Sequence, residues 1–321
     1  MGRDNRAFTQ PWRLVEVTSV TIQNRYLLRP SKKLNDLVVG VVARAQQKYE
    51  MPVICITVMS SHMHMLLHAR DPEHMAEFMG FVKTNLSKEI GTLHRWPGSM
   101  FADRYHHVEV SDAETDQIDR LKYCLANGVK EFLVDRPDQW PGVHSATALV
   151  EGEDLLGHWY DRTRQHAARQ RGEKNVDKEQ FASEERLFLS PLPCWAELPE
   201  AEYRRRVAEL VEEIVEEGER ERRRTGNTSM GVASILSADE HYRPKKVEKS
   251  PKPRFHAKNR AVWKRMWEAW RAITAAFREA SARLLSGERD IDFPEGTFPP
   301  HGPFVPFAEI LLAQQPRGQP A

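Results

Sequence analysis

The fold of this chain is decided by residues 53–67, which read VICITVMSSHMHMLL. Apolar and β-branched residues stand on both sides of Ser60-Ser61, the only turn signal, and this pattern predicts two strands joined as a hairpin. Side chains alternate across a strand, so His62 and His64 are expected on one face while Met63 and Met65 point into a core. Two imidazoles on one face can bind a divalent ion, or can simply belong to a polar sheet face.

Around this hairpin, the first 150 residues alternate between strands and helices. Residues 12–22 predict a first strand, and Ser31 begins a helix with an apolar stripe. Asp71-Pro72 begins a second helix, residues 105–110 predict a strand, and a third helix starts at Ser111 and ends at Asn127-Gly128. This order predicts an α+β, ferredoxin-like domain, with a split βαβ antiparallel sheet and helices on one face, over residues 1–150.

The composition sets broad limits on the class of protein. The chain has 321 residues, of which 40% are hydrophobic, so it is long enough for two domains. A polar N-terminus and the lack of a long apolar run predict a cytoplasmic protein with no membrane partner. Three well-separated cysteines suit a reducing compartment. The net charge of +1 leaves nucleic-acid binding open, because the charges are locally segregated.

Residues 151–321 predict a mostly α-helical extension. Helices are expected at about 198–224 and 259–286, with a basic linker at 226–258 and a proline-rich tail after it. The second of these helices has an aromatic stripe, which is more typical of a core or docking surface than of a platform for bases. The linker carries seven cations that predict either an arm in contact with DNA or a solvated segment, namely Arg243, Lys245, Lys246, Lys249, Lys252, Arg254 and Lys258.

The helix that starts at Ser111 carries the most informative polar residues. Its apolar residues fall on one face, and Tyr123 lies nearly opposite that face at 100° per residue. Asn127 follows four positions later, which is the spacing of two neighbours on one side of a helix. In a domain with two histidines on one strand face, such a phenol and carboxamide suggest a nucleophile and a metal ligand. The alternative is that Tyr123 is an ordinary surface aromatic residue.

The chemistry of this set is coherent for a phosphodiester. Two histidine nitrogens and one amide oxygen leave positions on Mg²⁺ or Mn²⁺ where a phosphate oxygen can bind. A tyrosine phenolate is both a suitable nucleophile and a tolerable leaving group, because the phenol has an ordinary pKa of about 10.

Four landmarks in order resemble those of the single-tyrosine HUH transposases. They are residues 58–67, 101–105 and 123–129, followed by Trp140-Pro141 with Ser145. The resemblance is greatest to the insertion-sequence-200-like group and its REP-associated tyrosine transposase branch. The family usually has proline and asparagine before the first histidine and proline after the ligand asparagine, where this chain has Ser60-Ser61 and Gly128.

The resemblance implies a palm-like ferredoxin fold, a divalent metal on His62, His64 and Asn127, and a nucleophile at Tyr123. It implies transposition, with cleavage and rejoining of single-stranded or hairpin DNA through a covalent 5′-phosphotyrosine, in a bacterial-type protein associated with the nucleoid when it acts. It also raises a homodimer that exchanges its tyrosine helices. Two alternatives stay open: a domesticated protein that binds a DNA hairpin without cutting it, and a metallonuclease that uses water.

Cations near the site would hold the DNA backbone. The candidates by position in the sequence are Lys83, Lys88, Arg95, Arg104, Arg120 and Lys130.

Overall fold

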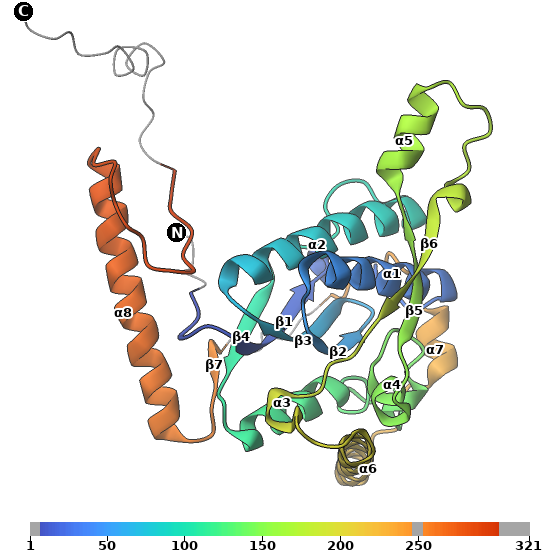
Figure 1. Cartoon of the computed structure of the whole chain (residues 1–321). Coiled ribbons are helices and arrows are strands. Elements are labelled where there is room, and N and C mark those ends of the chain that lie inside the picture. Colours follow the sequence, from blue (N-terminus) through green and yellow to red (C-terminus); the bar gives the residue numbers. More distant parts are fainter. Residues whose placement is uncertain (1–6, 246–252, 302–321) are drawn as a thin grey trace, which may run out of the picture.

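A five-stranded sheet forms the centre of the computed structural model, which describes residues 7–245 and 253–301 (Figure 1). The strand order is β2-β3-β1-β4-β7. The strands are β1 (Arg13–Val20), β2 (Val53–Val58), β3 (His62–Ala69), β4 (His106–Val110) and β7 (Phe255–His256). The α+β class and the ferredoxin-like order of elements are confirmed. The sheet is mixed rather than wholly antiparallel, because β7 returns from the extension and pairs parallel with β4.

Helices cover both faces of this sheet, whereas the sequence predicted helices on one face. The helices α1 (Lys32–Tyr49) and α2 (Pro72–His94) lie on one face, and α3 (Glu114–Leu125), α4 (Ala146–Glu151) and α6 (Glu200–Thr225) lie on the other (Figure 1). The physical reason is that the strands are apolar on both sides. Val15 and Val17 face α1 and α2, while Leu14 and Leu66 pack with α3 and α6.

The outer edge of β2 is covered by the segment that contains the last sequence landmark. Val58 N donates to Val143 O at 2.9 Å, and Ser145 N donates to Ile56 O at 3.0 Å. The indole of Trp140 also donates to Val58 O, at 2.9 Å. These bonds satisfy an otherwise open strand edge and hold the hairpin that carries His62 and His64.

The extension adds a second, smaller sheet and further helices. The strands β5 (Leu155–Tyr160) and β6 (Ala182–Leu187) form an antiparallel pair beside α1, with α5 (Arg162–Gln170) between them in the chain. The fit of β5 against α1 is close, because a Cβ added to Gly40 would lie 2.1 Å from His158 O. The remaining helices are α7 (Val232–Ser237) and α8 (Arg260–Leu285), and short 3-10 turns occur at Ile22–Asn24, Pro137–Gln139, Lys178–Phe181 and Pro193–Trp195.

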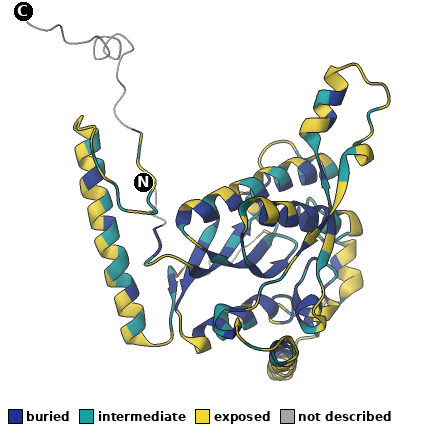
Figure 2. Cartoon of the chain, in the orientation of Figure 1, coloured by how far each residue is buried: buried dark blue, intermediate teal, exposed yellow. Residues whose placement is uncertain are grey.

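The helices predicted at 198–224 and 259–286 correspond to α6 and α8. The burial pattern in Figure 2 shows a buried sheet and a largely exposed α8. Lys246, Lys249 and Lys252 of the predicted basic arm lie outside the described residues. Within residues 7–245 and 253–301, no helix has both the length and the apolar character that crossing a membrane requires.

Candidate functional site

The two histidines lie on the sheet face covered by α3. Their ring centroids are 5.0 Å apart and the ring planes are nearly perpendicular, at 85°. Thr18 of β1 and Thr57 of β2 stand directly opposite His64 in the strand register. Met63, between the histidines, is buried in the core on the other face. The alternation of the strand therefore separates the polar residues from the core, as predicted.

Tyr123 of α3 lies next to this histidine pair. Its ring meets that of His64 edge to face, with 5.9 Å between centroids, and its side chain is 38% exposed. The guanidinium of Arg120 lies 4.8 Å from the centre of the phenol ring, and the ammonium of Lys130 lies 3.9 Å from it. The structure thus brings together an accessible phenol, an imidazole and two cations that can attract a phosphate.

Glu16 of β1 belongs to this site, although the sequence did not single it out. It is 3% exposed, its Oε1 lies 2.9 Å from His64 Nδ1, and its Oε2 accepts a hydrogen bond from Arg120 at 2.7 Å. Burial raises the pKa of this carboxyl, but His64 and Arg120 together bring it below its ordinary value. The sequence does contain a signal, because Leu14, Glu16 and Thr18 share one face of a strand that is otherwise rich in apolar residues.

The two imidazoles have the arrangement expected of metal ligands. Nδ1 of His62 lies 3.1 Å from Ser61 Oγ, and Nδ1 of His64 is engaged by Glu16 and by Thr18 at 3.2 Å. Each ring therefore keeps Nε2 for an ion. Burial, with help from His64 and Lys130, lowers the pKa of His62 to about 3, so this ring is neutral at pH 7.

A third ligand would have to be of another kind than histidine, cysteine or carboxylate. No cluster of three such residues that could hold a metal occurs in the part of the chain that the structure describes. An amide oxygen, a water molecule or a phosphate oxygen can complete the coordination of Mg²⁺ or Mn²⁺. The residues present thus fit a metal that takes two protein nitrogens and further oxygen ligands.

Asn127, which was predicted to lie on the same helical side as Tyr123, is buried, whereas Tyr123 is partly exposed. The helix α3 ends at Leu125, and Asn127 is 2% exposed. Its Nδ2 donates to the carbonyl oxygens of Tyr123 and Cys124, both at 3.1 Å. The same Cys124 oxygen accepts from Thr57 Oγ1 at 3.1 Å. Asn127 is therefore linked to the histidine face through the carbonyl that it shares with Thr57. Within the described part of the chain, no hydrogen bond joins Asn127 directly to His62 or His64.

The turn after Asn127 depends on glycine. Gly128 has a φ of +97°, and its carbonyl accepts hydrogen bonds from the backbone of Leu133 and Val134 at 2.8 and 3.3 Å. Proline is restricted to a φ of about −65°, so the proline that is usual at this position in the family could not adopt this conformation.

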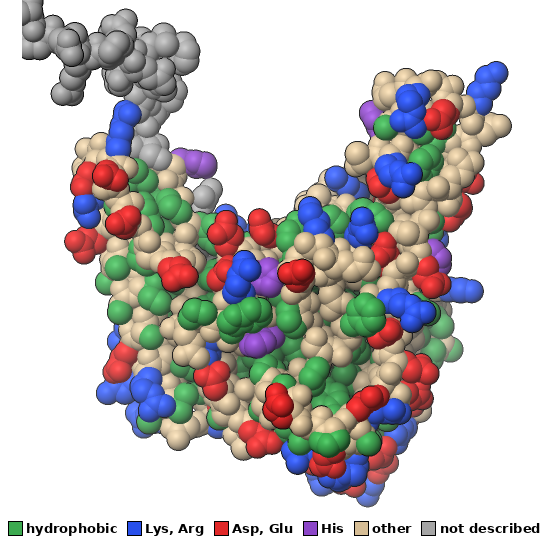
Figure 3. All heavy atoms as spheres, viewed as in Figure 1, with side chains coloured by type: hydrophobic (Ala, Val, Ile, Leu, Met, Phe, Trp, Pro, Cys, Tyr) green, Lys and Arg blue, Asp and Glu red, His purple; other side chains and the backbone are tan. Residues whose placement is uncertain are grey.

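The candidate cations are divided between the two faces of the sheet. Arg120 and Lys130 lie at Tyr123. The three on α2 or its C-cap, namely Lys83, Lys88 and Arg95, belong to the helix that covers the opposite face. Arg104 lies in the exposed loop before β4, and Arg243 and Lys245 follow α7. Acidic and basic side chains are interspersed over the face shown in Figure 3, so local cations matter more there than a general basic surface.

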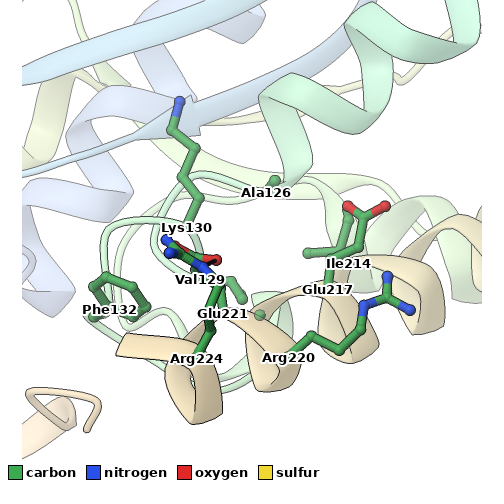
Figure 4. A pocket seen from close by; sticks show the side chains of 10 residues that line it. Ala126, Val129, Lys130, Phe132, Ile214, Glu217, Arg220, Glu221 and Arg224 are labelled. Atoms are coloured by element: carbon green, nitrogen blue, oxygen red, sulfur yellow. Dashed lines mark hydrogen bonds and ion pairs between the residues drawn. The ribbon is translucent and has the colours of Figure 1, made fainter. Parts of the chain in front are cut away.

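A cavity of about 400 Å³ lies beside the site, between the loop after α3 and α6 (Figure 4). Val129 and Ile214 contribute apolar lining, and acidic and basic side chains of α6 surround it. In Figure 4 Lys130 extends away from α6, which agrees with its position over the Tyr123 ring. The cavity therefore adjoins the candidate site without containing the histidines or the tyrosine.

One segment of this chain is similar to a known family of proteins. In particular, residues 18–123 match the family described as "Transposase IS200 like". The match begins at Thr18, includes both histidines and ends at Tyr123, and for this segment it confirms the family predicted from the motifs. No curated protein has a significant sequence match.

Two solved structures are similar in part. One is described as the REP-associated tyrosine transposase bound to a REP hairpin, with 14% identity, 47% of this chain and 86% of that chain covered, and a TM-score of 0.40. The other is a putative transposase from Deinococcus radiodurans R1, with 16% identity, 38% and 93% coverage, and a TM-score of 0.27.

Proposed function

We propose that this chain is a single-tyrosine transposase that cleaves and rejoins single-stranded DNA, including DNA hairpins. The observation that carries the proposal is the contact between the exposed Tyr123 ring and His64, inside a segment that matches a transposase family. In this proposal residues 1–150 carry the chemistry and residues 151–321 support it, in a monomer or a homodimer.

The reaction proceeds by two transesterifications. The Tyr123 oxygen attacks the scissile phosphorus and loses its proton, while the bond from phosphorus to the 3′ oxygen breaks and that oxygen leaves as a hydroxyl. The 5′ phosphate is then linked to Tyr123. A 3′ hydroxyl of another strand attacks this phosphotyrosine and releases the phenol. One phosphodiester replaces another at each step, so rejoining needs no nucleotide cofactor.

The neighbouring residues position the phosphate and the histidines. Arg120 and Lys130 place two positive charges beside the phenol, where they attract the phosphate and stabilise charge that develops on it. Glu16 orients the ring of His64 through Nδ1. Mg²⁺ or Mn²⁺ held by His62, His64 and Asn127 would polarise a phosphate oxygen.

The test uses the purified full chain with end-labelled hairpin oligonucleotides from the flanks of its own gene, with Mg²⁺, Mn²⁺ or a chelator. We expect a covalent protein–DNA band on a denaturing gel that needs the metal and is lost in Tyr123→Phe, while the variant still retards DNA on a native gel.

Two outcomes would contradict the proposal. Retarded DNA with no adduct under any metal would indicate a hairpin-binding protein without cleavage activity. Cleaved products without an adduct, unaffected by Tyr123→Phe, would indicate a metallonuclease that uses water.

A further inference from the structure

A histidine of the extension reaches the hydrogen-bond network behind the candidate site. The strand β7 is held beside β4 by its backbone, since Glu109 N donates to Arg254 O at 2.9 Å and Ser111 N donates to His256 O at 3.0 Å. Lys258 N then donates to Asp116 Oδ1 at 2.9 Å. This anchoring leaves the His256 side chain to make contacts of its own.

His256 contacts Arg120, the residue that connects the site. Arg120 donates through Nη2 to His256 Nδ1 at 2.7 Å and through Nη1 to Glu16 at 2.7 Å. Glu16 in turn contacts His64 at 2.9 Å. An unbroken series of short contacts therefore runs from the extension to one of the two histidines, with the guanidinium 4.8 Å from the Tyr123 ring.

The direction of these hydrogen bonds defines the tautomer of the His256 ring. A guanidinium can only donate, so Nδ1 must accept and the ring proton must be on Nε2. Nε2 lies 3.1 Å from Asp119 Oδ2, although not in aligned hydrogen-bond geometry, and Asp119 also accepts from Lys258 Nζ at 2.8 Å. Burial and Arg120 lower the pKa of His256, which agrees with a neutral ring.

We infer that His256 is a positioning residue for the proposed tyrosine chemistry, and that the extension completes the site through it. The inference rests on the proposed function. Two acceptors on different strands fix the guanidinium, so that Arg120 holds Glu16 against His64 and remains beside the phenol. Without His256, the guanidinium of Arg120 keeps only Glu16 as an acceptor and can adopt more rotamers. Its hold on Glu16 and its position beside the phenol of Tyr123 are then both weakened.

The test compares three substitutions of His256 that differ in where they leave a hydrogen-bond acceptor. His256→Asn keeps an acceptor, Oδ1, where Nδ1 lies. His256→Gln reaches the position of Nε2 instead, and His256→Ala removes both. His166→Asn, at an exposed position of α5, is the matched control. Each protein is measured for Mn²⁺ affinity without DNA, for the rate of adduct formation at saturating Mn²⁺, and for the ¹⁵N shifts of the His64 ring.

We expect His256→Ala and His256→Gln to lower Mn²⁺ affinity and adduct rate by about 10-fold, with a changed His64 tautomer signal, and His256→Asn to restore most of the loss. Unchanged values in His256→Ala, or rescue by glutamine but not by asparagine, would overturn the inference. An altered His64 signal in His256→Ala, in a protein whose wild type forms no adduct, would support the positioning role while refuting the proposed function.

Discussion

Glu16 and His64 are joined by a 2.9 Å contact between Oε1 and Nδ1, on adjacent strands of the sheet. The other oxygen of Glu16 is 2.7 Å from Arg120, so one buried carboxylate connects an expected metal ligand to a cation beside Tyr123. A carboxylate on the second nitrogen of a ligating histidine orients the ring and raises its basicity. The residues that would bind the metal and those that would bind the phosphate are thus connected through the carboxylate of Glu16.

Replacing this carboxylate should weaken the metal site. In Glu16→Gln the side chain keeps its size but loses its charge, so we expect the Mn²⁺ affinity, measured by calorimetry, to fall by between about 10- and 100-fold. The matched control is Glu89→Gln, which removes a buried carboxylate paired with Arg162 at 2.6 Å on the opposite face. Equal Mn²⁺ affinity in wild type and Glu16→Gln would refute the role of Glu16.

Lys130 and Lys88 should differ in their effect on the reaction. Lys130→Gln removes a charge 3.9 Å from the Tyr123 ring, so we expect slower adduct formation. We also expect the slope of log binding constant against log salt concentration for single-stranded DNA to become less steep by about 0.7. Lys88→Gln removes an exposed charge from α2, across the sheet, and should leave the adduct rate unchanged. Similar losses of rate in both variants would mean that the DNA path extends over both faces.

His144 should make the fold less stable in mild acid. Its Nε2 donates to Leu125 O at 3.2 Å and its Nδ1 accepts from Ala146 N at 3.1 Å, which requires a neutral ring. Burial lowers its pKa from 6.5 to about 4. The unfolded chain therefore binds the extra proton first as the pH falls below 6.5, and the native state loses stability down to about pH 4.

The size of this effect can be measured by urea unfolding at pH 7 and pH 5. From the two pKa values, the contribution of His144 to the free energy of unfolding should fall by up to about 2 kcal/mol between these pH values. In His144→Gln the difference between pH 7 and pH 5 should shrink by that amount, whereas His166→Gln, at an exposed position, should behave like the wild type. An undiminished difference in His144→Gln would show that other groups cause the acid sensitivity.

Gly128 should tolerate no side chain without loss of stability. Its φ is +97°, and an added Cβ would lie 3.3 Å from Val134 Cγ2, so we expect Gly128→Ala to lower the free energy of unfolding by about 1–2 kcal/mol. Gly80→Ala is the control, because a Cβ there meets nothing within 4 Å inside α2, and it should stabilise by about 0.5–1 kcal/mol. Because Asn127 is a metal ligand in the proposed function and precedes Gly128, we also expect Gly128→Ala to lower Mn²⁺ affinity.

Local patterns in the sequence were sufficient for the elements that surround the site. The hairpin of 53–67, the helix cap at Asp71, whose side chain accepts from His74 N at 2.7 Å, and the exposed side of α3 at Tyr123 all follow from periodicity and turn chemistry. These features depend on neighbours within a few residues, so the amino-acid sequence by itself determines them. The placement of two histidines on one strand face is of this kind.

The tertiary structure alone decided which distant residues meet. Glu16 lies 48 residues before His64, and His256 lies 136 residues after Arg120. Neither separation has a local signature, because such contacts depend on strand order and on the return of β7 to the edge of the sheet. The same holds for the burial of Asn127, because the helical spacing from Tyr123 does not reveal that Asn127 is 2% exposed while Tyr123 is 38% exposed. Periodicity identifies the face of each element, and packing determines its partner.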